Sequence, residues 1–122
     1  MSRAVSILVV EDEFLLAMGV EALLTGAGWS VIGPAGTLAS ALKLASSAAC
    51  DAAVLDVNLK GERVDGVADV LAERAIPFLF MTGYGRENLP AAYRDSAVVI
   101  GKPFSDRELL KALRNLLPQV SD

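Results

Sequence analysis

The sequence predicts an α/β protein of the (βα)5 type, in which helices cover both faces of a doubly wound, five-stranded parallel sheet. Two observations predict this fold. Short apolar runs alternate along the chain with longer segments of helical period. The runs are almost continuously apolar, which favours strands that are covered on both faces. The length of 122 residues favours a single domain over residues 1–122, with a core at about 5–117 and no effector domain.

Five apolar runs are expected to form the strands. The first stops at three consecutive acids, Glu11 to Glu13, and the third ends at Asp56. Because helical segments lie between the runs, each connection is expected to be a right-handed crossover. The runs are residues 5–10, 29–32, 52–56, 78–81 and 97–100.

Apolar residues at helical spacing predict the helices between these strands, and four segments have a clear apolar face. The residues that mark these faces are Phe14, Met18 and Ala22; Leu38, Leu42 and Ala45; Val64, Val67 and Leu71; and Leu109, Leu113 and Leu116. The fourth connection, residues 83–95, contains Gly83, Gly85 and Pro90 and few large apolar groups. We therefore expect it to be short or irregular.

Composition excludes several classes of function. Fifteen acidic against 11 basic residues give a net charge of −4, which argues against direct nucleic-acid binding. The absence of histidine excludes His-based acid–base chemistry, and the single cysteine, Cys50, excludes an intrachain disulfide. No apolar run is long enough for a secretion signal or a membrane span, so we expect a cytoplasmic protein without membrane insertion.

Polar residues gather where four of the expected strands end. Glu11 and Asp12 follow the first strand, Asp56 ends the third, Thr82 follows the fourth and Lys102 follows the fifth. The carboxyl ends of parallel strands lie at one edge of a sheet, where ligands bind in doubly wound folds. A strand order with the first strand at the centre would bring these five side chains to one crevice.

Each of these residues also has a structural interpretation. Glu11 and Glu13 could begin the first helix, where acids interact favourably with the helix dipole. Asp56 and Thr82 could form local turns, and Lys102 could be a surface lysine. The combination favours chemistry, because a hard divalent cation relieves the repulsion between clustered carboxylates, and oxygen ligands select Mg²⁺. A lysine and a hydroxyl at the same edge suit a phosphoryl group.

Four sequence segments together resemble one known family. They are ILVVEDE at 7–13, AVLDVNLKG at 53–61, FLFMTGYG at 78–85 and VVIGKPF at 98–104. In this order they resemble a response-regulator receiver domain, with a CheY-like, flavodoxin-like fold, over essentially the whole chain. The segment at 78–85 is similar to an alphaproteobacterial subgroup with an F-x-T-G-Y signature, in which the fourth helix is often irregular.

The resemblance implies a metal site and a phosphoacceptor. Asp56 would accept the phosphoryl group. Mg²⁺, for which Mn²⁺ can substitute, would be bound by Asp12 and Asp56 directly, by Glu11 through a water molecule, and by the backbone carbonyl of Asn58. Thr82 would contact the incoming phosphoryl group.

Lys102 would also contact the phosphoryl group, and the following Pro103 either forms a simple turn or holds a cis peptide that directs the lysine inward. Two positions depart from the family pattern: Glu11 stands where an aspartate is commoner, and Val99 is the other. Many receivers carry an aromatic residue where this chain has Val99, so Tyr84 is the nearby candidate for a switch residue. Asn58 and Tyr84 flank the expected phosphorylation site and are candidates for tuning dephosphorylation.

The resemblance implies a single-domain response regulator of a two-component phosphorelay. A histidine kinase or a histidine phosphotransfer protein would donate the phosphoryl group to Asp56, which changes a protein-binding surface of a monomer or weak dimer. The chain would then be a phosphoacceptor and not an enzyme that turns over a substrate. A hydrolase with an aspartyl-phosphate intermediate is disfavoured because Asn58 cannot act as a general acid. The main alternative is a receiver-like adaptor that is never phosphorylated.

Overall fold

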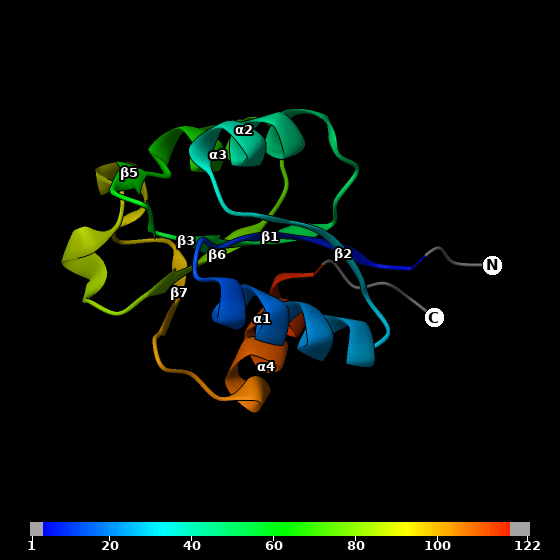
Figure 1. The fold of residues 1–122 in the computed structure, drawn as a ribbon. Helices are drawn as coiled ribbons and strands as arrows, with labels where there is room; N and C mark the ends of the chain where they lie inside the picture. The colour runs from blue at the N-terminus through cyan, green and yellow to red at the C-terminus, as the bar shows by residue number, and fades with distance from the viewer. Residues whose placement is uncertain (1–3, 118–122) are drawn as a thin grey trace.

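Five parallel strands form one sheet in the order β2-β1-β3-β6-β7 (Figure 1). The computed structural model describes residues 4–117, so the outermost parts of the expected 1–122 domain lie outside the described residues. The predicted five-stranded parallel sheet is confirmed, with the first strand inside the sheet between β2 and β3, and β3 at the centre. The strands are β1 Ser6–Val10, β2 Ser30–Ala35, β3 Ala52–Asp56, β6 Phe78–Thr82 and β7 Val98–Gly101.

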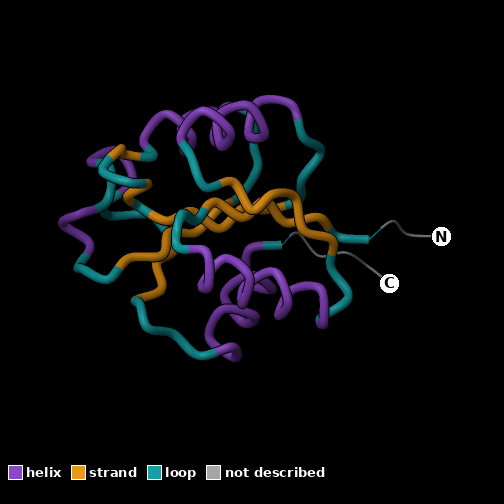
Figure 2. The backbone as a smooth tube through the Cα atoms, viewed as in Figure 1, coloured by secondary structure: helices purple, strands orange, loops and turns teal. Residues whose placement is uncertain are grey.

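Within residues 4–117, four α-helices cover the two faces of this sheet (Figures 1 and 2). Helices α1 (Phe14–Gly26) and α4 (Asp106–Leu116) pack on one face, and α2 (Leu38–Ser47) and α3 (Asp65–Glu73) on the other. Successive residues of a strand point to opposite faces, so each strand contributes to two apolar clusters, one beneath each pair of helices. Strand β3 is buried along its whole length, which explains its continuous apolar sequence.

The connection between β6 and β7 contains two 3-10 turns, η1 (Arg86–Asn88) and η2 (Ala91–Tyr93), and no α-helix. The prediction of a short or irregular fourth helix is therefore confirmed. The connection is anchored by Leu89, whose side chain is fully buried, and by Tyr93, whose ring packs edge-on against Phe78. These two anchors hold the connection against the sheet without a helix.

A short antiparallel hairpin that the sequence analysis did not predict follows β3. Its strands are β4 (Asn58–Leu59) and β5 (Glu62–Arg63). The two turn residues between them, Lys60 and Gly61, both have positive φ, 49° and 85°. This is the backbone of a type I′ turn, for which glycine at the second position is favourable. The hairpin lies beside the carboxyl end of β3 and forms one wall of the functional site.

Strand β2 extends beyond its predicted end to Ala35, through Gly33 and Pro34. The predicted run covered residues 29–32, and in the sequence Gly33 and Pro34 follow it directly. Strand β2 is at the edge of the sheet and pairs with β1 alone. On the other side of Pro34 there is no strand that would need a hydrogen bond from its missing N–H. The Gly33–Pro34 peptide bond is cis.

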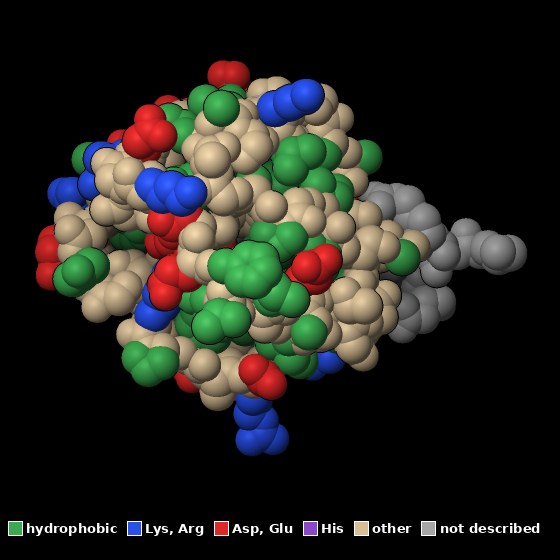
Figure 3. Space-filling model, in the orientation of Figure 1, with side chains coloured by type: hydrophobic (Ala, Val, Ile, Leu, Met, Phe, Trp, Pro, Cys, Tyr) green, Lys and Arg blue, Asp and Glu red, His purple; other side chains and the backbone are tan. Residues whose placement is uncertain are grey.

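Large apolar side chains are exposed at the start of α1. The exposed fractions are 72% for Phe14, 82% for Leu15 and 50% for Met18. In Figure 3, apolar atoms gather over α1 beside the acidic side chains of the carboxyl edge. We call these three residues the α1 patch. Within residues 4–117, none of the helices has both the length and the apolar character that a membrane span requires.

Candidate functional site

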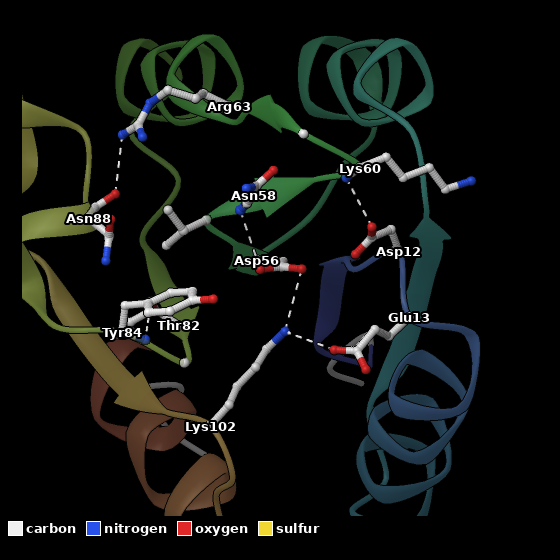
Figure 4. A pocket seen from close by; sticks show the side chains of 13 residues that line it. Asp12, Glu13, Asp56, Asn58, Lys60, Arg63, Thr82, Tyr84, Asn88 and Lys102 are labelled. Carbon is white, nitrogen blue, oxygen red and sulfur yellow. Dashed lines mark hydrogen bonds and ion pairs between the residues drawn. The ribbon is translucent and has the colours of Figure 1, made fainter.

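A pocket of about 570 Å³ opens at the carboxyl edge of the sheet (Figure 4). Its walls come from the loop after β1, the end of β3, the β4–β5 hairpin, and the ends of β6 and β7. The site therefore forms where the parallel strands end, as the sequence analysis predicted. Strand β1 pairs with β3, with Val10 opposite Leu55, so the carboxyl ends of these two strands lie side by side.

Three carboxylates form the centre of this site. Glu11, Asp12 and Asp56 each present an oxygen, and these oxygens all lie within 4.8 Å of one another. Glu11 and Asp56 are buried, with exposed fractions of 2% and 7%. Burying negative charges this close together is unfavourable unless cations or hydrogen-bond donors compensate for it.

Backbone amides compensate for part of this charge. The N–H of Glu13 donates to Glu11 Oε2 at 2.9 Å, and the N–H of Asn58 donates to Asp56 Oδ1 at 3.3 Å. The N–H of Lys60, at the turn of the hairpin, donates to Asp12 Oδ2 at 2.9 Å. Each carboxylate thus has one oxygen that is bonded to a backbone N–H.

Lys102 supplies a positive charge to the cluster. Its Nζ lies 2.9 Å from Glu11 Oε1, 3.4 Å from Asp56 Oδ2 and 3.6 Å from Glu13 Oε1. The lysine is positioned by β-sheet pairing, because its N–H donates to Thr82 O at 2.8 Å. Its peptide bond with Pro103 is cis. Burial acts to lower the pKa of Lys102, but Glu11 and Asp56 outweigh it and raise the pKa above its usual value.

The pKa values of Asp56 and Asp12 are shifted in opposite directions. Burial, and then the charge of Glu11, raise the pKa of Asp56 to about 7, although Lys102 opposes the shift. Burial also acts to raise the pKa of Asp12, but hydrogen bonds, foremost that from Lys60 N–H, lower it below its usual value. The more exposed Asp12 therefore keeps its negative charge more readily than Asp56 does.

The donor set of the cluster fits a hard divalent cation. Glu11 Oε1 is buried and forms no hydrogen bond, although Lys102 Nζ lies at ion-pair distance from it. Together with one carboxylate oxygen each from Asp12 and Asp56, this is an all-oxygen set of ligands, which Mg²⁺ and Mn²⁺ prefer. Asn58 is exposed and also lines the pocket.

Thr82 and Tyr84 form the wall opposite Asp12 in Figure 4. Thr82 is buried, and its Oγ1 accepts a hydrogen bond from Tyr84 N–H at 3.0 Å. The Tyr84 side chain is 78% exposed and borders the pocket. Val99 is partly buried and pairs with Phe80 in the sheet, packed against the core on the α2–α3 face. Val99 is absent from the pocket lining, whereas Tyr84 is part of it.

Four side chains of the pocket wall were not predicted from the sequence: Val57, Lys60, Arg63 and Asn88. Arg63 Nη2 donates to the backbone carbonyl of Asn88 at 3.2 Å, which joins β5 to η1. The Lys60-Gly61 dipeptide was an available signal for a tight turn after β3. No comparable signal pairs Arg63 with a residue 25 positions further along the chain.

A family model of the response regulator receiver domain matches residues 7–114. The chain belongs to this family. Receiver domains are generally phosphoacceptors in two-component signalling and usually bind Mg²⁺, and the acidic cluster described above is present in this chain. A receiver also implies an interaction with a phosphodonor such as a histidine kinase.

Two curated or solved relatives are similar over most of this receiver. SdrG from Sphingomonas melonis Fr1 has a solution structure with 42% sequence identity and a TM-score of 0.81, which covers 95% of this chain and 98% of SdrG. A BeF3-activated conformation of SdrG has 41% identity and a TM-score of 0.77. The phyllosphere-induced regulator PhyR of Methylorubrum extorquens is 38% identical over 104 residues. The matched part covers 83% of this chain but only 39% of PhyR.

The receiver fold is shared with more distant proteins. A CheY-like response regulator receiver domain from Methanospirillum hungatei JF-1 has a TM-score of 0.81 at 21% identity, and covers 93% of each chain. This likeness confirms the predicted flavodoxin-like arrangement of the sheet and helices.

Proposed function

We propose that this receiver accepts a phosphoryl group on Asp56 in a reaction that requires Mg²⁺. The observation that carries the proposal is the position of Asp56, whose Oδ2 lies 3.4 Å from Lys102 Nζ beside the carboxylates of Glu11 and Asp12. A nucleophile, a cation-binding set and a fixed positive charge thus meet at one opening. Phosphoryl transfer depends mainly on positioning and on neutralising charge, which these groups supply.

In the proposed reaction, a carboxylate oxygen of Asp56 attacks the phosphorus of a phosphohistidine. The new O–P bond forms as the P–N bond breaks, and the imidazole leaves with the bonding electron pair. Lys102 interacts with the phosphoryl oxygens, and the hydroxyl of Thr82 donates to one of them. Asp12, Asp56, the Asn58 backbone carbonyl and, through water, Glu11 would hold Mg²⁺ or Mn²⁺, which neutralises phosphoryl charge when it is bound.

The α1 patch supports a protein as the phosphodonor. Exposed apolar residues that lie together next to a reactive site are typical of a docking surface. Phe14 and Leu15 follow directly after Glu13, which lines the pocket. We propose that a histidine kinase or a histidine phosphotransfer protein packs on this patch in the cytoplasm and presents its phosphohistidine to Asp56.

The proposed output is an altered protein-binding surface on a monomer or weak dimer. SdrG, a relative, has a BeF3-activated conformation. We extend the idea of an activated conformation to this chain. The connection between β6 and β7 is the candidate for the element that changes, because it carries Tyr84 and is not an α-helix. Water would later hydrolyse the aspartyl phosphate, and the chain would turn over no external substrate.

Intact-mass spectrometry after incubation with acetyl phosphate tests this proposal. We expect one added phosphoryl group in the presence of Mg²⁺ and none after chelation with EDTA. The variant Asp56→Asn is expected to lose the adduct, and the control Asp95→Asn, at an exposed aspartate outside the pocket, to keep it. An adduct that persists in Asp56→Asn would overturn the assignment. If neither acetyl phosphate nor a cognate kinase phosphorylates the chain, phosphorylation of Asp56 is ruled out, and the function is that of a receiver-like adaptor that is never phosphorylated.

A further inference from the structure

The β4–β5 hairpin contacts three separate parts of the site. It starts at Asn58, whose N–H donates to Asp56, and its turn reaches Asp12 through the N–H of Lys60. Its last residue, Arg63, donates to the carbonyl of Asn88 in η1 (Figure 4). The buried side chain of Leu59 anchors the hairpin to the core. One six-residue element therefore connects the acidic cluster to the connection between β6 and β7.

Arginine side chains donate to three successive carbonyls, two in η1 and one at the residue that follows it. Arg63 donates to Asn88 O from outside the connection, whereas Arg94, within it, donates to Glu87 O at 3.3 Å and to Leu89 O at 3.4 Å. A single 3-10 turn leaves most of its carbonyls without partners of its own, so side-chain donors can decide its position.

Besides the local bond from Tyr84 N–H to Thr82 Oγ1, two side-chain hydrogen bonds join residues 83–97 to the rest of the described chain. One is Arg63 to Asn88 O, and the other is Tyr93 to Asp69, which anchors η2 to α3. The Arg63 bond is the one that lies at the pocket. Asp65 accepts from Arg63 Nε at 3.1 Å, and this second contact orients the guanidinium toward Asn88.

The hydrogen bond between Lys60 and Asp12 connects this element to the cation site. Asp12 Oδ2 accepts from the backbone N–H of Lys60, and Asp12 is one of the three carboxylates that suit a divalent cation. A cation that shares this carboxylate weakens it as an acceptor for the Lys60 N–H, which changes the position of the hairpin turn. A movement of a hairpin this short also displaces Arg63 at its other end.

We propose that Arg63 is a positioning residue that transmits occupation of the acidic cluster to η1 through the β4–β5 hairpin. The inference rests on the cation site of the proposed function, but it does not depend on phosphorylation of Asp56. Lysine cannot replace Arg63 fully, because only the guanidinium fork donates to Asp65 and to Asn88 O at the same time.

The test is a Mg²⁺ titration of the ¹⁵N-labelled full chain followed by NMR. The amide of Lys60 reports on the cluster, and the amide of Leu89 reports on η1 because it belongs to the same peptide group as Asn88 O. In the wild-type protein we expect both amides to shift with one common Mg²⁺ midpoint. In Arg63→Gln, the Lys60 midpoint is expected to change by less than about threefold, and the Leu89 shift to fall by at least about half.

Two further variants sharpen the test. Arg63→Lys is expected to give an intermediate Leu89 shift. Arg107→Gln removes an exposed arginine of α4, outside the pocket, and is expected to behave as the wild type. The proposal is wrong if Leu89 responds in Arg63→Gln as in the wild type, or if the wild-type Leu89 amide stays unchanged while Lys60 titrates.

The outcomes also separate this inference from the proposed function. A normal Mg²⁺ response at both amides, with no phosphoryl adduct from any donor, would leave the role of Arg63 intact and overturn phosphorylation. A wild-type chain in which neither amide responds to Mg²⁺ would overturn both the role of Arg63 and the cation site.

Discussion

Lys102 lies closer to Glu11 than to Asp56, with Nζ–carboxylate distances of 2.9 Å and 3.4 Å. The side chain of Glu11 is fully buried, whereas that of Lys102 is 18% exposed. Lys102 therefore has two roles. It compensates the buried negative charge of Glu11, and it lies beside the proposed phosphoacceptor Asp56. Its removal is expected to affect both stability and chemistry.

Lys102→Met tests both effects. We expect the free energy of unfolding to fall by about 1–3 kcal/mol, because Glu11 is left buried without a cation. Phosphoryl incorporation from acetyl phosphate is expected to slow by about 100-fold, since a fixed charge at the transferred group is lost. Urea unfolding and timed mass spectrometry measure the two effects. Lys111→Met, at an exposed lysine of α4, serves as the control and should change neither.

Asp56→Asn is expected to stabilise the metal-free protein. The substitution removes one of three carboxylates whose oxygens lie within 4.8 Å, and so reduces their mutual repulsion. At pH 7.5 in EDTA, the gain is expected to be about 1–2 kcal/mol, or roughly 4–8 °C in Tm. Thermal unfolding measures this change. Mg²⁺ should raise the Tm of the wild type more than that of Asp56→Asn, and an equal response of both would argue against Asp56 as a ligand.

Leu15→Glu separates the docking surface from the chemistry. Leu15 is 82% exposed, so stability is expected to stay within about 0.5 kcal/mol of the wild type. Transfer from a cognate protein donor should fall by about tenfold or more, because a charge is placed in an apolar contact. Phosphorylation by acetyl phosphate should remain unchanged, because this donor needs no docking surface. Equal losses with both donors would contradict a docking role.

Tyr93 is expected to resist ionisation. Burial, and then its 2.8 Å hydrogen bond to Asp69, raise its pKa from 10.0 to about 12. The folded state favours the neutral phenol, so this contribution to stability is complete below pH 10 and is lost as the pH rises towards 12. In Tyr84→Phe, Tyr93 is the only tyrosine left. Phenolate absorbance of this variant should show about 10% ionisation at pH 11, whereas a midpoint near pH 10 would contradict the prediction.

Gly33 has a backbone that other residues adopt only with strain. Its φ is +93°, and an added Cβ would lie 2.7 Å from Ala35 N and 3.0 Å from Val9 O. Gly33→Ala is therefore expected to cost about 2–3 kcal/mol in urea unfolding. Gly19→Ala, in an exposed position of α1 with open space around it, is the matched control. It should leave stability unchanged or raise it by about 0.5–1 kcal/mol.

The sequence predicted the centre of the site because parallel strands end at a common edge. That rule sufficed to bring Glu11, Asp12, Asp56, Thr82 and Lys102 together, since each follows or ends an apolar run. It also indicated an irregular connection after β6, because Gly83, Gly85 and Pro90 weaken a helical pattern there.

The walls of the site could not be predicted in the same way. The strands of the β4–β5 hairpin have two residues each, too few to show an alternating pattern. The bond from Arg63 to Asn88 O depends on a backbone carbonyl, and every residue type carries one. The extension of β2 through Pro34 depends on its position at the edge of the sheet, which only the strand order reveals.

The single tryptophan, Trp29, lies at the opposite end of the sheet from the pocket. It precedes β2, and the guanidinium of Arg114 lies 5.8 Å from the centre of its ring. A strand of five or six residues places it about 15–20 Å from the carboxyl edge. Its fluorescence emission should therefore follow denaturation, which separates Trp29 from Arg114, and stay constant when Asp56 is modified. Optical assays of activation will need a fluorophore introduced near Tyr84, while the native indole serves as an internal reference for intact protein.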